Sequence, residues 1–113
     1  MSNYVDIFQS WRDVQSQYDM QEHEPDEVIY AQYSYESYSG YSNVVYRNGD
    51  RFYWVRGSHC SCYGLEGQWE PEEYSADQFI EAYNRGNWWE SDEWPSSVID
   101  RVREFAGVNY NGA

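Results

Sequence analysis

The chain contains no lysine, and this absence limits what the protein can do. All seven basic residues are arginines, against 20 aspartates and glutamates, so the 113 residues carry a formal net charge of −13. A phosphate-binding loop of the Walker type requires lysine, which excludes that mechanism for the glycine-containing run at 64–67. Strong acidity also argues against nucleic acid or anionic lipid as a direct partner, because an anionic surface repels both.

Long apolar runs are missing as well. No segment approaches the roughly 20 apolar residues that a membrane span needs. The N-terminus has neither the basic start nor the apolar stretch of a secretory signal. We therefore expect a cytoplasmic protein without membrane contact, in which Cys60 and Cys62 are reduced thiols.

Aromatic residues are abundant, while aliphatic residues are scarce. One residue in five is Phe, Trp or Tyr, which is untypical of a disordered acidic tail. The length predicts a single domain over residues 1–113, with a core built largely from rings. Buried tyrosine hydroxyls and tryptophan N–H groups need hydrogen-bond partners, so this core should contain polar contacts.

The N-terminal half predicts a helix followed by a β-meander. Residues 3–20 carry one apolar stripe at helical spacing, with Ser2 or Asn3 as the cap, and a linker with acidic residues at 22, 24, 26 and 27 follows. Residues 27–56 alternate like strands, with turn signals at Ser39-Gly40 and at Asn48-Gly49. The register expected from two-residue turns pairs Tyr33 with Tyr46, Tyr35 with Val44, and Val44 with Tyr53.

The meander should have two different faces. We take one face as the core; it consists of Ile29, Ala31, Tyr33, Tyr35, Val44, Tyr46, Tyr53 and Val55. The other face is too apolar for a solvated surface, and another element or a partner should cover it. Its members are Glu36, Val45, Phe52, Trp54 and Arg56.

The C-terminal half predicts a loop and two helices. Residues 57–74 form a loop rich in glycine and cysteine. Ser75 and Gln78 form a capping box that opens a helix over 76–85, which ends at Gly86. Pro95 opens a second helix over 96–106, which ends at Gly107. The predicted fold class is therefore α+β: a three-stranded antiparallel meander, an N-terminal helix and two C-terminal helices on one sheet face.

Acidic residues concentrate in the last 45 residues, and some of them are spaced to share helix faces. Asp77 and Glu81, and likewise Asp100 and Glu104, stand four residues apart, which places each pair on one side of its helix. Such an array can imitate the charge density of duplex DNA and occupy a cationic groove. The alternative is a very soluble acidic protein with no special partner. The full predicted partner-binding set is Glu70, Glu72, Glu73, Asp77, Glu81, Glu90, Asp92, Glu93, Asp100 and Glu104, together with Trp88, Trp89 and Trp94.

The three tryptophans of this set have two interpretations. Rings beside carboxylates suit an arginine-rich partner, through stacking and charge. The same rings would equally well fasten the two helices to the sheet.

Metal binding and catalysis have weaker support. His59, Cys60 and Cys62 are three candidate zinc ligands, but a structural site takes four ligands and usually a wider cysteine spacing. His59 and Cys60 are adjacent on an extended segment and point in opposite directions, which is unfavourable for nucleophilic catalysis. We expect no enzymatic activity and no cofactor.

Residues 57–71, GSHCSCYGLEGQWEP, resemble a segment of small bacteriophage and prophage proteins to which no activity is assigned. Small acidic phage proteins are often inhibitors of host defence systems or of host nucleic-acid enzymes. The resemblance therefore implies an inhibitor of the anti-restriction or anti-CRISPR kind, acting in the bacterial cytoplasm on a basic host protein. A protein-binding module that uses Phe52, Trp54 and the tryptophan cluster as an apolar anchor, and a small metal-binding domain, are the alternatives.

Overall fold

The computed structural model describes residues 4–6, 8–36, 39–59, 64–85 and 96–111. Its elements, in chain order, are β1 (Tyr4–Asp6), α1 (Trp11–Tyr18), β2 (Glu27–Glu36), β3 (Ser39–Asn48), β4 (Arg51–His59), β5 (Glu72–Tyr74), α2 (Ala76–Asn84) and α3 (Ser96–Asn111). The five strands form one sheet in the order β1-β2-β3-β4-β5. Strands β2 to β5 pair antiparallel, and β1 pairs parallel to β2. The α+β class and the central meander are confirmed, whereas both edge strands were missed.

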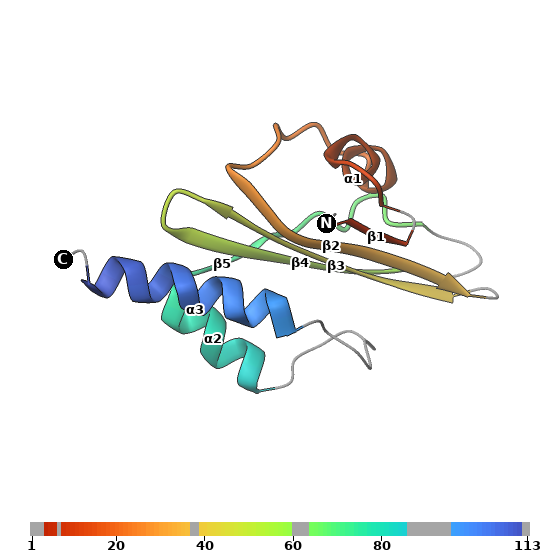
Figure 1. Ribbon diagram of the computed structural model, residues 1–113. Helices are drawn as coiled ribbons and strands as arrows, with labels where there is room; N and C mark the ends of the chain where they lie inside the picture. The colour runs from red at the N-terminus through yellow and green to blue at the C-terminus, as the bar shows by residue number, and fades with distance from the viewer. Residues whose placement is uncertain (1–3, 7, 37–38, 60–63, 86–95, 112–113) are drawn as a thin grey trace.

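The sheet separates two cores. Helix α1 lies on one face of the sheet, and α2 and α3 lie on the other (Figure 1). The α1-side core consists of Phe8, Trp11, Val14, Tyr18, Ala31, Tyr33, Val44, Tyr46, Val55 and Leu65. The helix-pair core consists of Ile29, Tyr30, Val45, Phe52, Trp54, Phe79, Ala82, Val98 and Val102. The second face of the meander is therefore covered by the chain's own C-terminal helices.

The predicted N-terminal helix over 3–20 is wrong at its beginning. Residues Tyr4–Asp6 add a parallel strand to the edge of β2, and the helix begins only after Ser10. Ser10 is extended and its hydroxyl accepts from Asp13 N–H, while the Asp13 carboxylate accepts from Gln9 N–H at 2.9 Å. This reciprocal cap, and not Ser2 or Asn3, defines the start of the helix. The predicted stripe from Phe8 to Tyr18 is nevertheless buried.

The predicted strand register is also wrong, by an even number of residues. Tyr33 lies opposite Ser42 and not Tyr46, and Val44 lies opposite Val55 and not Tyr53. The β3–β4 turn is Gly49-Asp50, where Gly49 alone takes a positive φ of 61°, as in a type II′ turn. Because side chains alternate with a period of two, an even shift leaves the predicted faces intact.

Two further strand predictions fail. Ser39 and Gly40 belong to β3, opposite Glu36 and Tyr35, so they are not a turn. A register shift between Val28 and Tyr30 moves Ile29 into the helix-pair core, although the alternation had placed it on the opposite face. Such a bulge adds one residue to a strand and reverses the alternation locally.

The predicted C-terminal helices are close to the observed ones. The Ser75–Gln78 capping box is present in both directions, and α2 ends at Asn84 with Arg85 as its C-cap. Helix α3 continues past Gly107 to Asn111, so the predicted stop there is wrong. Phe79, Val98 and Val102 are fully buried against the sheet, as the helical spacing predicts. Gly86 and Pro95 lie outside the described residues.

Candidate functional site

Seven of the thirteen residues in the predicted partner-binding set lie in the described part of the chain: Glu70, Glu72, Glu73, Asp77, Glu81, Asp100 and Glu104. The other six, Trp88, Trp89, Glu90, Asp92, Glu93 and Trp94, lie outside the described residues. Of the seven, three are in ion pairs with arginine. The predicted array is therefore not one uniformly anionic face.

Strand β5 separates two of the paired acids. Glu72 pairs with Arg56, whose guanidinium lies over the Trp54 ring in the helix-pair core. Glu73 pairs with Arg51 at 3.1 Å and accepts from the Tyr53 hydroxyl at 3.0 Å. Consecutive strand residues point to opposite faces, so these two carboxylates do not act together.

The helical acids are more exposed. Glu81 pairs with Arg85 one turn further along α2, and both side chains are about two-thirds exposed (63% and 65%). Asp77 is exposed on the first turn of the same helix, and Asp100 and Glu104 are exposed on α3. The predicted i, i+4 placement is confirmed for both helices, but Arg85 offsets one of the four charges.

Most of the remaining arginine pairing involves a single carboxylate, Glu27 at the start of β2. Arg101 of α3 donates to both of its oxygens, at 2.6 and 2.7 Å, and Arg47 of β3 donates at 3.1 Å. The hydrogen bond from Arg101 is the largest cause of a lowered pKa at Glu27, followed by opposing desolvation and the bond from Arg47. The Arg47 guanidinium also lies 4.9 Å from the centre of the Phe105 ring. These contacts fasten α3 to the sheet.

A second group of acids lies on the α1 side, and only one of its members, Glu70, belongs to the predicted partner-binding set. We call it the α1-side acidic surface: Asp19, Glu22, Glu24 and Asp26 in the linker after α1, and Glu66 and Glu70 in the loop before β5. All six are exposed. None of the ion pairs found among the described residues includes any of them. The acidic spacing of the linker was visible in the sequence, but its proximity to the later loop was not.

Hydrogen bonds to Glu22 join these two segments. Its backbone carbonyl accepts from Trp11 Nε1 and from Gln15 Nε2, both at 2.8 Å. Its carboxylate accepts from Trp69 Nε1 at 2.9 Å, across 47 residues of sequence. The linker and the loop therefore form one surface over α1 and the sheet.

Carboxylates of this surface help to raise the pKa values of two nearby tyrosines. Burial is the main cause of a raised pKa at Tyr4, and the charges of Glu24 and Asp13 raise it further. Burial likewise raises the pKa of Tyr46, with an added contribution from Glu22. A negative charge disfavours ionisation of a neighbouring phenol, so several chain segments contribute negative potential here.

Three parallel rings lie beside the α1-side acidic surface. Trp69 stacks on Tyr46 with centroids 5.9 Å apart and planes 4° apart, and Tyr46 stacks on Tyr53 at 5.0 Å and 14°. Trp69 and Tyr53 are half-buried, whereas Tyr46 is buried between them. Half-exposed rings beside carboxylates are favourable contacts for a guanidinium group.

The alternative prediction was a protein-binding module with an apolar anchor, and it is wrong for two of the anchor residues. Phe52 and Trp54 are fully buried, against Phe79 at 6.1 and 5.7 Å between ring centroids. They are part of the helix-pair core and cannot contact a partner.

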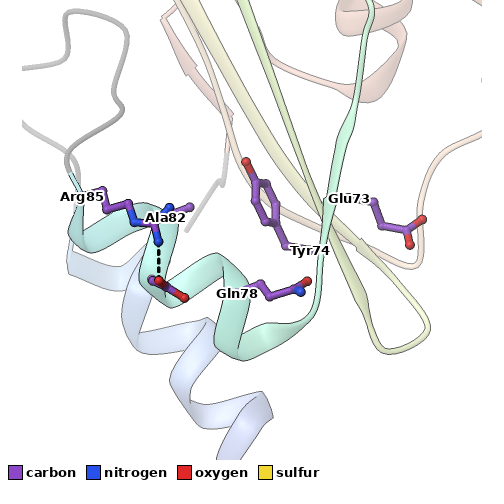
Figure 2. A pocket seen from close by; sticks show the side chains of 6 residues that line it. Glu73, Tyr74, Gln78, Ala82 and Arg85 are labelled. Atoms are coloured by element: carbon purple, nitrogen blue, oxygen red, sulfur yellow. Dashed lines mark hydrogen bonds and ion pairs between the residues drawn. The ribbon is translucent and has the colours of Figure 1, made fainter.

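A hollow of about 320 Å³ lies between β5 and α2. Figure 2 shows Glu73 and Tyr74 on the strand, with Gln78, Ala82 and Arg85 on the helix beside it. Glu81 completes the lining. The sequence does not predict this hollow, because its pattern over residues 57–74 predicts a loop where the structure has strand β5.

No metal centre appears in the part of the chain that the structure describes. His59 ends β4, and Cys60 and Cys62 lie outside the described residues. Among the described side chains, no group of three or more His, Cys, Asp or Glu residues could hold a metal ion. Within the same residues, no helix has the length and apolar character needed to cross a membrane.

Comparison of the chain with protein-family models, with curated proteins and with solved structures found no match in any of the three. Its function must therefore be inferred from its own surface chemistry.

Proposed function

We propose that this protein is a non-catalytic inhibitor of the bacteriophage type. It binds a basic, nucleic-acid-binding protein of a bacterial host, in the host cytoplasm, and competes with DNA or RNA for the cationic groove of that protein. Host restriction and CRISPR components are the class of target that the proposal favours. The binding element is the α1-side acidic surface, with the exposed acids of α2 and α3 as a second, weaker contribution.

The observation that carries the proposal is the distribution of ion pairs. Arginines offset Glu27, Glu72, Glu73 and Glu81, whereas the six carboxylates of the α1-side acidic surface have no arginine partner among the described residues. Like charges on one surface repel each other and destabilise the fold. A cationic partner would remove that repulsion on binding.

Local rigidity supports the same proposal. Glu22 is held by Trp11, Gln15 and Trp69 before any partner arrives. A surface that is already ordered loses less conformational entropy on binding than a mobile acidic tail. The half-buried Trp69 and Tyr53 rings add contact area suited to arginine side chains.

Capture from a bacterial lysate, followed by identification of the bound proteins, tests the proposal. The variant Asp19→Asn/Glu24→Gln/Glu70→Gln removes three exposed carboxylates that make no ion pair within the described ranges. Asn is also tolerated at position 19, where φ is 53°. At roughly 0.5 kcal/mol for each charge, this variant should capture about tenfold less of the nucleic-acid-binding target.

The matched control is Asp77→Asn/Asp100→Asn/Glu104→Gln, which removes the same number of charges from α2 and α3. It should retain most of the capture. Raising the salt from about 0.05 M to about 0.5 M should release the target from the unmodified protein, because screening weakens exposed charge contacts. Equal loss in both variants, capture that does not depend on salt, or a captured set without nucleic-acid-binding proteins would contradict the proposal.

A further inference from the structure

The turn between β3 and β4 contains a chemically labile dipeptide, Asn48-Gly49. In deamidation, the backbone nitrogen of the following residue attacks the asparagine side-chain carbon, and glycine hinders this attack least because it has no Cβ. Both residues are exposed, and a Cβ added to Gly49 would meet no atom within 4 Å. Water therefore reaches the dipeptide, and its sequence alone predicts rapid deamidation.

Two hydrogen bonds to Asp26 hold the two groups that would react. The Gly49 N–H, which is the attacking group, donates to Asp26 Oδ2 at 2.8 Å. The Asn48 side-chain carbonyl, which is the group attacked, accepts from the Asp26 backbone N–H at 2.9 Å. Asp26 stands 22 and 23 residues before its two partners, in the linker that leads to β2. A distant segment, and not the turn itself, therefore supplies both contacts.

The backbone of the turn is also unsuited to the reaction. Asn48 is the last residue of β3 and lies opposite Arg51 in the antiparallel ladder. A residue in such a strand has ψ of about +135°, and the five-membered ring of the deamidation intermediate can close only after rotation about this bond. The Arg47 guanidinium donates to the Gly49 carbonyl as well. The turn therefore cannot rotate without breaking contacts to Asp26 and Arg47.

We propose that Asn48-Gly49 is a latent deamidation site, which Asp26 keeps unreactive while the linker lies against the turn. The Asp26 carboxylate holds the Gly49 N–H, and its negative charge disfavours the loss of the amide proton that the attack requires. Once the contact is released, the Gly49 nitrogen bonds to Asn48 Cγ, and ammonia leaves with the proton from that nitrogen. Water then opens the succinimide ring to aspartate or isoaspartate.

The modification would change both charge and shape. Either product carries one more negative charge than Asn48, and isoaspartate adds one carbon atom to the backbone of the turn. The inference concerns the chain's own chemistry, so it goes beyond the inhibitory function proposed above.

The test incubates the full chain at mildly alkaline pH and follows, by mass spectrometry of proteolytic peptides, the conversion of the amide at residue 48 to an acid. The folded chain should react at least about tenfold more slowly than a synthetic peptide of residues 44–52, which lacks Asp26. Asp26→Ala removes the acceptor of the Gly49 N–H and should react about five- to tenfold faster than the unmodified chain. The matched control Glu24→Ala, which removes a carboxylate from the same linker, should react at the unmodified rate.

Two further variants separate this contact from the general stability of the fold, and urea unfolding confirms that each variant is folded. Gly57→Ala perturbs the fold away from the turn and should leave the rate unchanged. Asp26→Asn keeps an acceptor oxygen without its charge and should react at an intermediate rate. A slower reaction in Asp26→Ala would make the carboxylate the base that removes the amide proton, and would overturn the proposal. Equal rates in Asp26→Ala and Glu24→Ala, or an equally fast reaction in Gly57→Ala, would also overturn it.

Discussion

Each face of the sheet is covered by helices and has its own core, but the two cores differ in their residues and in their polar contacts. On the α1 side the core is built from rings whose polar atoms are hydrogen-bonded, such as Tyr18 to Ser42 and Trp11 to the Glu22 carbonyl. On the helix-pair side, phenylalanine and valine dominate and one ring is hydrogen-bonded, Trp54 Nε1 to Asn43 Oδ1 at 3.3 Å. Helix α3 is held to the sheet there by the ion pair of Arg101 with Glu27. The difference extends to the surface. Four of the five described ion pairs lie on the helix-pair side, those of Glu27 with Arg47 and Arg101, of Glu72 and of Glu81.

This comparison shows what the arginines do. Four of the seven lie next to a carboxylate or a ring in the layer of α2 and α3, namely Arg47, Arg56, Arg85 and Arg101. On the α1 side, the one ion pair among the described residues is that of Glu73 with Arg51. The six carboxylates of the α1-side acidic surface have no arginine partner within those residues. The comparison can be tested by perturbing each side in turn.

The largest effect is expected in the helix-pair core. Phe79 is fully buried and packs against Phe52, Trp54 and Tyr74. Phe79→Ala should lower the free energy of unfolding by about 3–5 kcal/mol, because it removes a buried ring and leaves a cavity. Urea unfolding measures this. A loss below about 1 kcal/mol would mean that the helix pair is not packed as described.

A smaller effect is expected from overpacking the α1 side. A methyl group on Gly57 would lie 2.7 Å from the Tyr18 hydroxyl oxygen and 2.9 Å from Leu65 Cδ2. Gly57→Ala should therefore cost about 1–3 kcal/mol of unfolding free energy. The neighbouring exposed change Ser58→Ala is the control and should be close to neutral. Equal stability of the two variants would show that Tyr18 does not approach the strand here.

Tyr18→Phe should cost about 1–2 kcal/mol, because it leaves the buried Ser42 hydroxyl without its 2.9 Å partner. It should also change the response to alkali. Burial raises the pKa of Tyr18 above its usual value of 10, so its neutral form stabilises the fold below pH 10 and this contribution is lost as the pH rises further. Unfolding measured from pH 8 to 11 should show the gap between the two proteins narrowing. A constant gap would contradict the burial of this hydroxyl.

The smallest effect is expected for Glu27→Gln, at about 1 kcal/mol near neutral pH, since the pair is partly exposed. Here the dependence is on acid. The Arg101 hydrogen bond lowers the pKa of Glu27, so its contribution is present above the usual carboxyl value and is lost as the pH falls through the lowered one. Acid titration of both proteins should bring their stabilities together below about pH 4. If the two proteins still differ in stability at low pH, the shape of the Glu27 side chain and not its charge is responsible for the effect.

Part of this structure could be predicted from local signals, and part could not. The Ser75–Gln78 capping box and the spacing of Phe79, Val98 and Val102 define the C-terminal helices by themselves. The start of α1 was also readable, since Ser10 and Asp13 stand three apart as in a capping box, but the apolar stripe that continues before Ser10 obscured it. The edge strands have only three residues each and depend on pairing with distant strands, which no local pattern reports.

The candidate site was harder to predict for a related reason. The acids of α2 and α3 share helix faces as their spacing indicates, but Arg56, Arg51 and Arg85 neutralise three of the predicted carboxylates through contacts that depend on the fold. Conversely, the hydrogen bond between Trp69 and Glu22 joins two acidic segments 47 residues apart. Charge content is visible in a sequence, whereas the pairing of those charges is not.

Competition with DNA tests the central proposal most directly. A labelled DNA duplex is bound to the captured host protein, and its fluorescence anisotropy is followed as the purified chain is added. The unmodified chain and the control Asp77→Asn/Asp100→Asn/Glu104→Gln should release the duplex at similar concentrations, and Asp19→Asn/Glu24→Gln/Glu70→Gln should need about tenfold more. A duplex that stays bound when the chain saturates its target would contradict occupation of the nucleic-acid groove.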